Sequence, residues 1–198
     1  MTLSIQKTRE LISHENEENN LIKKIESITK SLRKQYFRNS LINLSKKNIE
    51  NARTIYNYII AEQTEINIKD STKEGKIKIL IWLSNHFKDQ KSFNDMTKYD
   101  ILDFLNTRRK SILEDPSQKW IGSYNGRQIV LNKFFRWLHN PDEPDHRKRE
   151  TPSCMTGIKK LPKKDISSYK PSDLWESREH AIFLKYCPSI RDRCYQFN

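Results

Sequence analysis

The sequence contains very little of what β-sheets are usually built from. Four glycines and a single valine, Val130, occur among its 198 residues, whereas isoleucine, lysine, asparagine and glutamate are plentiful. Strands favour valine and threonine, and the turns between them often need glycine because it adopts positive φ at no steric cost. The composition therefore argues against a β-protein and predicts an all-α fold.

Long apolar runs and paired cysteines are also missing. No stretch approaches the ~18 apolar residues of a membrane span, and the first 20 residues lack the apolar core of a signal peptide. The cysteines, Cys154, Cys187 and Cys194, are odd in number and lack the spacing of a disulfide framework or a zinc site. We therefore expect a cytoplasmic protein with no membrane partner, no metal and no cofactor.

Positive charge is what the chain has in excess. It carries 37 lysines and arginines against 25 acidic residues, a net charge of +12. A surface of this kind usually binds a polyanion such as nucleic acid, although lysine-rich proteins are often simply very soluble. The position of the charges along the chain must decide between the two.

Apolar side chains recur with the helical period of about 3.6 residues over most of the first 140 residues. We predict a short helix and a break within residues 1–20, followed by a helix over 21–44. Ser45 is a good N-cap for the next helix, and Thr97 with Asp100 forms the pattern of a capping box. The four further helices are predicted at 45–62, 70–87, 97–110 and 123–139.

Residues 140–173 differ from these segments because they contain five of the chain's seven prolines. Proline at this density interrupts helices, so we predict a linker, and its runs HRKR and KKLPKK make it basic. A further helix is predicted to begin at Ser172 and to end before Pro188. The chain is thus divided into an N-terminal helical extension, a four-helix domain, a linker and the start of another domain, at 1–44, 45–139, 140–173 and 174–198.

Four segments carry a resemblance to a known family. They are SKKNIENARTIYNYIIAEQTEINIKDSTKEGKIKILIWLS (45–84), MTKYDILDFLNTRRK (96–110), WIGSYNGRQIVLNKFFRWLHNPDEPDHRKRETP (120–152) and KPSDLWESREHAIFLKYCPSIRDRCY (170–195). In order and composition these parts resemble a tyrosine recombinase, the phage-integrase family, and more narrowly archaeal integrase-like proteins. The resemblance implies a SAM-like four-helix core-binding bundle that clamps one side of duplex DNA, with an N-terminal helical extension and a C-terminal orphan helix.

In that family a separate C-terminal domain performs the chemistry, in which a tyrosine attacks a DNA phosphate while arginine, lysine and histidine side chains stabilise the transition state. The resemblance places the first catalytic arginine beyond 188–198, so we expect a truncated catalytic domain, no catalytic residue and no enzymatic activity. His146 and Arg149 fit the family's His-x-x-Arg pattern but lie in the predicted linker. Tyr195 would belong to the first helices of the catalytic domain, and a motif counts only in its structural context.

We therefore expect a DNA-binding protein that acts as the core-binding arm of an integrase in DNA integration and recombination. Its expected partner is double-stranded DNA, with other integrase protomers as a second partner to consider and no small-molecule substrate. Two alternatives stay open. One is a regulator that occupies integrase sites without cutting, and the other is a half-enzyme that needs a separately supplied catalytic domain.

The helix predicted over 123–139 is the sharpest candidate for DNA contact, because it contains three basic residues and no acidic one. On a helical wheel the face opposite its apolar stripe is polar. Asparagine, glutamine and arginine read base edges, while lysine and arginine hold phosphates. An ordinary solvated face is the alternative. The candidates on this helix are Asn125, Arg127, Gln128, Asn132, Lys133 and Arg136.

Lysines elsewhere supply further candidates. On the helix over 70–87, the candidate phosphate contacts are Lys73, Lys76 and Lys78, with a solvated cluster as the alternative. In the linker, four lysines suit a strap across the DNA backbone, with a flexible tether as the alternative. They are Lys159, Lys160, Lys163 and Lys164. Trp82 and His86 lie off the apolar stripe and are expected to pack against a neighbouring helix rather than to contact DNA.

Overall fold

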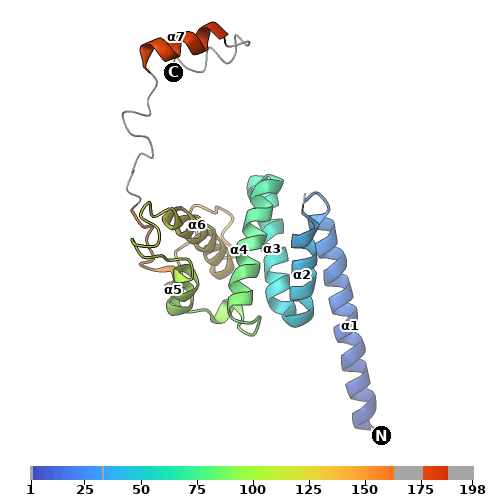
Figure 1. Ribbon diagram of the computed structural model, residues 1–198. Helices are drawn as coiled ribbons and strands as arrows, with labels where there is room; N and C mark the ends of the chain where they lie inside the picture. The colour runs from blue at the N-terminus through green and yellow to red at the C-terminus, as the bar shows by residue number, and fades with distance from the viewer. Residues whose placement is uncertain (1, 33, 163–175, 187–198) are drawn as a thin grey trace. The chain divides into compact units, whose positions relative to one another are not determined.

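The computed structural model describes residues 2–32, 34–162 and 176–186 (Figure 1). The chain divides into two units, Met1–Pro162 and Lys163–Asn198, and each is described by itself. All regular secondary structure in the described residues is helical, which confirms the predicted all-α class. None of the helices in this part of the chain combines the length and the apolar character needed to cross a membrane.

The first three helices form one side of the larger unit. They are α1 (Thr2–Thr29), α2 (Gln35–Lys47) and α3 (Ile49–Ile66). Each contributes buried apolar side chains to one common core, for example Ile25, Leu41 and Ile55, all fully buried. Residues 1–44, predicted as an extension, therefore contribute to the same core as the helices that follow.

Three predicted helix boundaries in this region are wrong. The helix predicted over 21–44 is interrupted, because α1 ends at Thr29 and α2 begins at Gln35. The break expected within residues 1–20 is absent, since α1 is continuous to Thr29. Ser45, the expected N-cap, lies in α2 and donates its hydroxyl hydrogen bond to the carbonyl of Ile42. Asn48 is the N-cap instead, and its side chain accepts a 2.9 Å hydrogen bond from the backbone N–H of Asn51. Asparagine and serine cap helices about equally well, so propensity alone does not choose between them.

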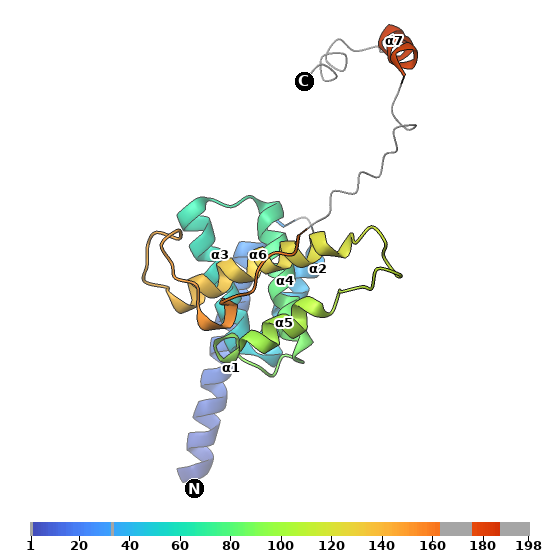
Figure 2. The same cartoon turned by 90° about the vertical axis from the view of Figure 1, so that its left-hand side faces the viewer.

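The other side of the larger unit begins with α4 (Asp70–His86), which lies between α3 and α6 (Figure 1). A 3₁₀ turn, η1 (Phe93–Asp95), leads to α5 (Lys98–Asn106), and a loop then leads to α6 (Trp120–His139). The predicted capping box of Thr97 and Asp100 is present at the start of α5. Figure 2 shows α6 crossing α3 and α4, both of which it contacts, and Leu131, Phe134 and Phe135 of α6 are completely buried.

Residues 140–162 pack on the helices rather than forming a free linker. A second 3₁₀ turn, η2 (Ser153–Met155), contacts α5 and α6, and Cys154, Met155 and Ile158 are buried there. Arg149 is 4% exposed, and its guanidinium donates two hydrogen bonds to the Glu65 carboxylate, at 3.0 and 2.5 Å. Proline excludes helix from this stretch, but it does not prevent the extended chain from docking.

In the second unit the structure describes residues 176–186. They include α7 (Ser177–Tyr186), on which Ile182 and Tyr186 are exposed. This helix falls within the range predicted from Ser172, and the remaining residues of the predicted domain start lie outside the described residues.

Candidate nucleic-acid interface

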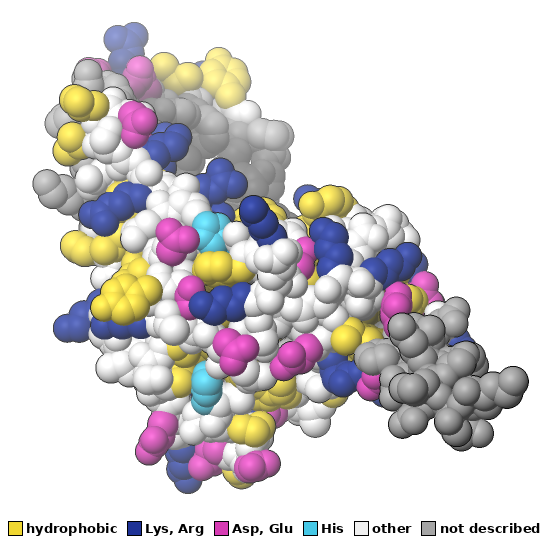
Figure 3. Space-filling view, turned by 90° about the horizontal axis from the view of Figure 1, so that it is seen from below, with side chains coloured by type: hydrophobic (Ala, Val, Ile, Leu, Met, Phe, Trp, Pro, Cys, Tyr) yellow, Lys and Arg dark blue, Asp and Glu magenta, His cyan; other side chains and the backbone are white. Residues whose placement is uncertain are grey.

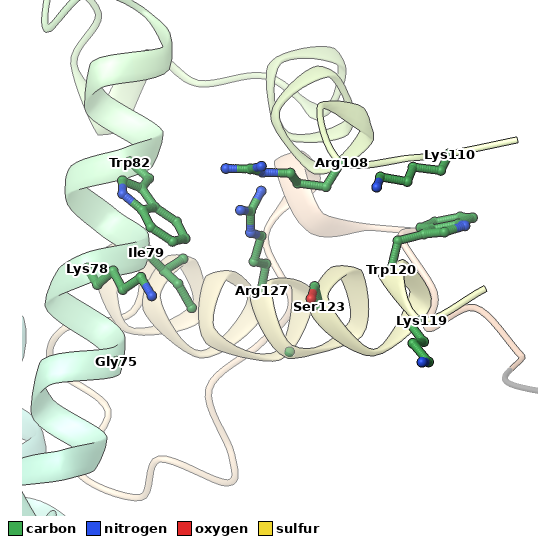
Figure 4. Close-up of a pocket in the computed structure, with 11 residues that line it drawn as sticks. Gly75, Lys78, Ile79, Trp82, Arg108, Lys110, Lys119, Trp120, Ser123 and Arg127 are labelled. Atoms are coloured by element: carbon green, nitrogen blue, oxygen red, sulfur yellow. The ribbon is translucent and has the colours of Figure 1, made fainter. Parts of the chain in front are cut away.

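A basic groove lies where α4, the first half of α6 and the loop after α5 meet (Figure 4). Eleven residues line it, and no aspartate or glutamate is among them. Its walls include two tryptophans, Trp82 on α4 and Trp120 at the start of α6. The five cations that line the groove are Lys78, Arg108, Lys110, Lys119 and Arg127. A groove lined by one sign of charge concentrates ligands of the opposite sign.

Small residues keep the groove open. Gly75 on α4 and both Gly126 and Ser123 on α6 line it. A Cβ atom built at Gly75 or Gly126 would meet no other heavy atom within 4 Å, so neither glycine is required for packing between the helices. Glycine in an exposed helix interior costs about 1 kcal/mol relative to alanine. Its presence here leaves room for a ligand to approach the two helix backbones.

Arg127 is held at the centre of the groove by aromatic side chains. Its guanidinium carbon lies 5.0 Å from the ring centre of Trp82 and 5.2 Å from that of Phe104. The residue is only 7% exposed, and one guanidinium nitrogen donates a long hydrogen bond of 3.5 Å to the hydroxyl of Thr107. Stacking of this kind fixes the planar group in one orientation.

Like charges converge at this point. The side chains of Arg108 and Arg127 extend toward each other (Figure 4). Burial lowers the pKa of Arg127, and the nearby charge of Arg108 lowers it further. On the opposite wall, the ammonium of Lys78 lies 4.4 Å from the ring centre of Trp82. An anion between these groups would relieve their mutual repulsion.

Other parts of the surface have a different character. The face seen in Figure 3 carries lysine and arginine interspersed with aspartate and glutamate. Several cations of the larger unit are paired, as Lys47 is with Asp89 at 3.2 Å and Lys91 with Asp100 at 2.7 Å. Among the described residues, no ion pair involves a cation that lines the groove. What distinguishes the groove is that no carboxylate residue is among those that line it.

Two of the predicted phosphate contacts on α4 are not at the surface. Lys73 is 2% exposed; its ammonium donates to the carbonyl of Ile28 at 3.2 Å and pairs with Asp70 at 3.0 Å. Lys76 is 4% exposed and pairs with Glu62 of α3. Both lysines connect α4 to earlier helices, which corrects the prediction that they face DNA. Lys78, the third candidate, does line the groove.

The polar face predicted on α6 holds the chain segment that follows the helix. The side-chain amide of Asn125 donates to the carbonyl of Leu161 at 2.9 Å and accepts from its N–H at 2.8 Å. Gln128, 6% exposed, donates to the carbonyl of Ile158 at 3.0 Å. The guanidinium of Arg136 donates to the carbonyls of residues 147 and 149. These three side chains have internal partners, contrary to the prediction of an outward face.

The remaining candidates have varied positions. Asn132 is half-buried and Lys133 is exposed on α6, while Lys159 and Lys160 are exposed on the segment beside that helix. Lys163 and Lys164 lie outside the described residues. Trp82 is half-buried in the groove wall, whereas His86 packs on Phe87 and Phe104 and lies 2.7 Å from the Asp103 carboxylate. Both side chains therefore pack against other residues, and Trp82 also lines the groove.

Sequence reasoning missed the contribution of the loop between α5 and α6. The helix predicted over 97–110 includes the basic run 108–110 at its end. The helix ends earlier, at Asn106, so that Arg108 and Lys110 lie in the loop and line the groove. Lys119 and Ser123, at the start of α6, were also not singled out. The run of three basic residues was the signal available in the sequence, and its place in a loop follows from the fold.

Comparison of the chain with protein-family models, with curated proteins and with solved structures finds no match in any of the three.

Proposed function

We propose that this chain binds double-stranded DNA through the basic groove, as the core-binding arm of a tyrosine recombinase or integrase. The observation that carries the proposal is the convergence of five cations, with no carboxylate among the lining residues, on a groove between two helices. Phosphate contacts from lysine and arginine supply most of the affinity of a protein for duplex DNA.

The aromatic lining orients the cations of the groove, and its walls are two α-helices. Trp82 and Trp120 both line the groove, and arginine and lysine side chains stack on their rings. Polar groups that reach base edges must come from elements that enter a groove of the duplex, and an α-helix fits the major groove. The second and fourth helices of the predicted four-helix domain correspond to α4 and α6. The resemblance assigns these two helices to the major groove of DNA, and they form the walls here.

Within this proposal the SAM-like bundle consists of α3, α4, α5 and α6, and the chain binds DNA without cutting it. In the family resembled, cleavage leaves a phosphotyrosyl bond between protein and DNA. We therefore expect no covalent adduct when the 198-residue chain is incubated with supercoiled plasmid and analysed by denaturing electrophoresis. An adduct at any tyrosine would contradict the non-catalytic part of the proposal.

The binding test is the salt dependence of duplex affinity. Fluorescence anisotropy with a labelled duplex of about 30 base pairs, repeated over a series of NaCl concentrations, gives the slope of log affinity against log salt. Lys78→Ala with Lys119→Ala removes two groove cations, and the slope should shrink by up to about 1.8, that is about 0.9 for each phosphate contact.

A matched pair of substitutions separates the groove from general charge. Lys23→Ala with Lys46→Ala removes the same two charges from exposed positions on α1 and α2, on the other side of the larger unit (Figure 1). This control should leave the slope nearly unchanged. If both pairs reduce the slope equally, the duplex binds through diffuse charge and the groove is not the interface.

A further inference from the structure

The orientation of Arg127 is fixed while most of its hydrogen-bonding capacity is unused. A guanidinium has five N–H donors. In the described structure a single long bond, to the Thr107 hydroxyl, accounts for one of its nitrogens, and the Trp82 and Phe104 rings hold its plane. A buried cation normally has a carboxylate partner, because an unpaired buried charge is costly. Only 7% of Arg127 is exposed, yet among the described residues no ion pair involves it.

A second arginine points at the same place. Arg108 is exposed, and its side chain extends from the loop after α5 toward the guanidinium of Arg127 (Figure 4). Ser123, one helical turn before Arg127 on α6, also lines the groove.

We propose that Arg108 and Arg127 form a specific subsite for one tetrahedral oxyanion. Planar guanidinium groups recognise phosphate through paired N–H···O bonds, and two of them can share one dianion. Within the proposed function, on which this assignment of the natural ligand rests, the oxyanion is one phosphate of the DNA backbone. The stacked, buried Arg127 sets the position of that phosphate, and the exposed side chain of Arg108 supplies the second guanidinium.

The subsite can be tested without DNA. Sodium sulfate serves as the probe, and NaCl is adjusted so that ionic strength stays constant through the titration. Thermal unfolding of the full chain, followed by tryptophan fluorescence, should show a midpoint that rises with sulfate and then saturates, because a ligand that binds the native state stabilises it. A rise that never saturates is the general effect of a kosmotropic salt and would overturn the subsite.

Substitutions assign the effect to residues. Arg108→Ala removes an exposed side chain and should weaken the apparent sulfate affinity about tenfold or more, the loss expected for a charge-assisted bidentate contact. Arg147→Ala removes the same charge at another exposed position and should respond to sulfate like the wild type. Arg127→Lys retains a charge but loses the planar fork and should also lose the saturable response. If Arg108→Ala keeps the wild-type response, the subsite is refuted even if Arg127→Lys fails to fold.

A competition experiment identifies the source of the bound oxyanion. If the subsite holds a backbone phosphate, sulfate should displace labelled duplex from the wild type more strongly than chloride at equal ionic strength. This excess should vanish in Arg108→Ala. Saturable sulfate binding without duplex binding would support the subsite for a free oxyanion and reject the proposed function. Duplex binding with no saturable sulfate response, in contrast, would reject the subsite and leave the proposed function intact.

Discussion

The buried ion pair between Lys76 and Glu62 allows a direct test of whether this lysine of α4 has a structural role or contacts DNA. The side chains are 6% and 9% exposed, and the ammonium also lies 5.3 Å from the centre of the Tyr58 ring. Burial lowers the pKa of Lys76, although the hydrogen bond and the negative charge of Glu62 act to raise it. Lys76 is therefore part of the protein interior, and the negative charge of Glu62 favours its protonated form.

Removing one partner should be strongly destabilising. Lys76→Met leaves the Glu62 carboxylate buried without its cation, and Glu62→Leu leaves the ammonium without its anion. Breaking a buried pair in this way costs about 3–5 kcal/mol. In a chain of 198 residues, 1 kcal/mol lowers the unfolding midpoint by about 2–4 °C, so each single variant should unfold on the order of 10 °C below the wild type.

Replacing both partners together should restore most of the lost stability. The double variant, Lys76→Met with Glu62→Leu, replaces the pair by apolar side chains of similar size. Such replacements are often neutral or even stabilising by about 1–4 kcal/mol. Calorimetry on the wild type, the two single variants and the double variant completes a double-mutant cycle, which isolates the coupling between the two groups.

The same four proteins decide whether Lys76 binds DNA. In the double variant the slope of log duplex affinity against log salt should equal that of the wild type, because Lys76 is internally paired. A decrease of about 0.9 in the double variant would mean that Lys76 does contact a phosphate, and the structural role argued here would be refuted. Additive losses of stability in the cycle would refute the ion pair itself.

Three further outcomes are expected. Gly126→Ala should raise the free energy of unfolding by about 0.5–1 kcal/mol by chemical denaturation, since its Cβ meets no neighbour, whereas Gly126→Glu should fold but lose duplex affinity because it places an acid in the groove. Asn125→Ala should cost about 1–3 kcal/mol through two lost hydrogen bonds to Leu161, with an unchanged salt slope for duplex binding. Although burial acts to raise the pKa of Asp100, hydrogen bonds from Lys91 and Thr97 hold it below the usual value. Its stabilising contribution is therefore present above about pH 4 and lost as pH falls further, and Asp100→Asn should flatten the stability-versus-pH curve in that range, measured by urea unfolding.

Features that depend on neighbours in the sequence could be predicted from the sequence. The periodicity of apolar residues located α3, α4 and α6, since residues three and four apart share one face of a helix. The capping box of Thr97 and Asp100 was recognised because its two residues are three apart, and the structure has it. These signals are local, so no knowledge of the tertiary fold is needed to interpret them.

The burial of charged side chains could not be predicted in this way. Lysine is rarely fully buried, so Lys73 and Lys76 were assigned to the surface. Lys73 has a local partner, Asp70, on its own helix, but the contacts that bury the two lysines lie on other helices, at Ile28 of α1 and Glu62 of α3. A long lysine stem can cross an apolar interface to reach such a partner, and only the packing of the helices determines whether it does.

The faces of α6 were also difficult to predict from the sequence, because this helix has three different environments. One face packs on the core, and a second holds residues 156–162 through Asn125 and Gln128. Ser123, Gly126 and Arg127 face the groove. A helical wheel distinguishes apolar from polar faces, but it does not distinguish a polar face covered by another part of the chain from one open to solvent.

The docked segment also determines which part of α6 is open to a ligand. Arg136, near its C-terminal end, donates to the backbone of the chain at residues 147 and 149. The N-terminal half instead faces a groove completed by the irregular loop that contains Arg108 and Lys110. When a guanidinium donates its N–H groups to backbone carbonyls, those donors are no longer available to a phosphate. Among the α6 residues predicted to contact DNA, Arg127 alone lines the groove. Under the proposed function, DNA contact by α6 is therefore expected from its N-terminal half.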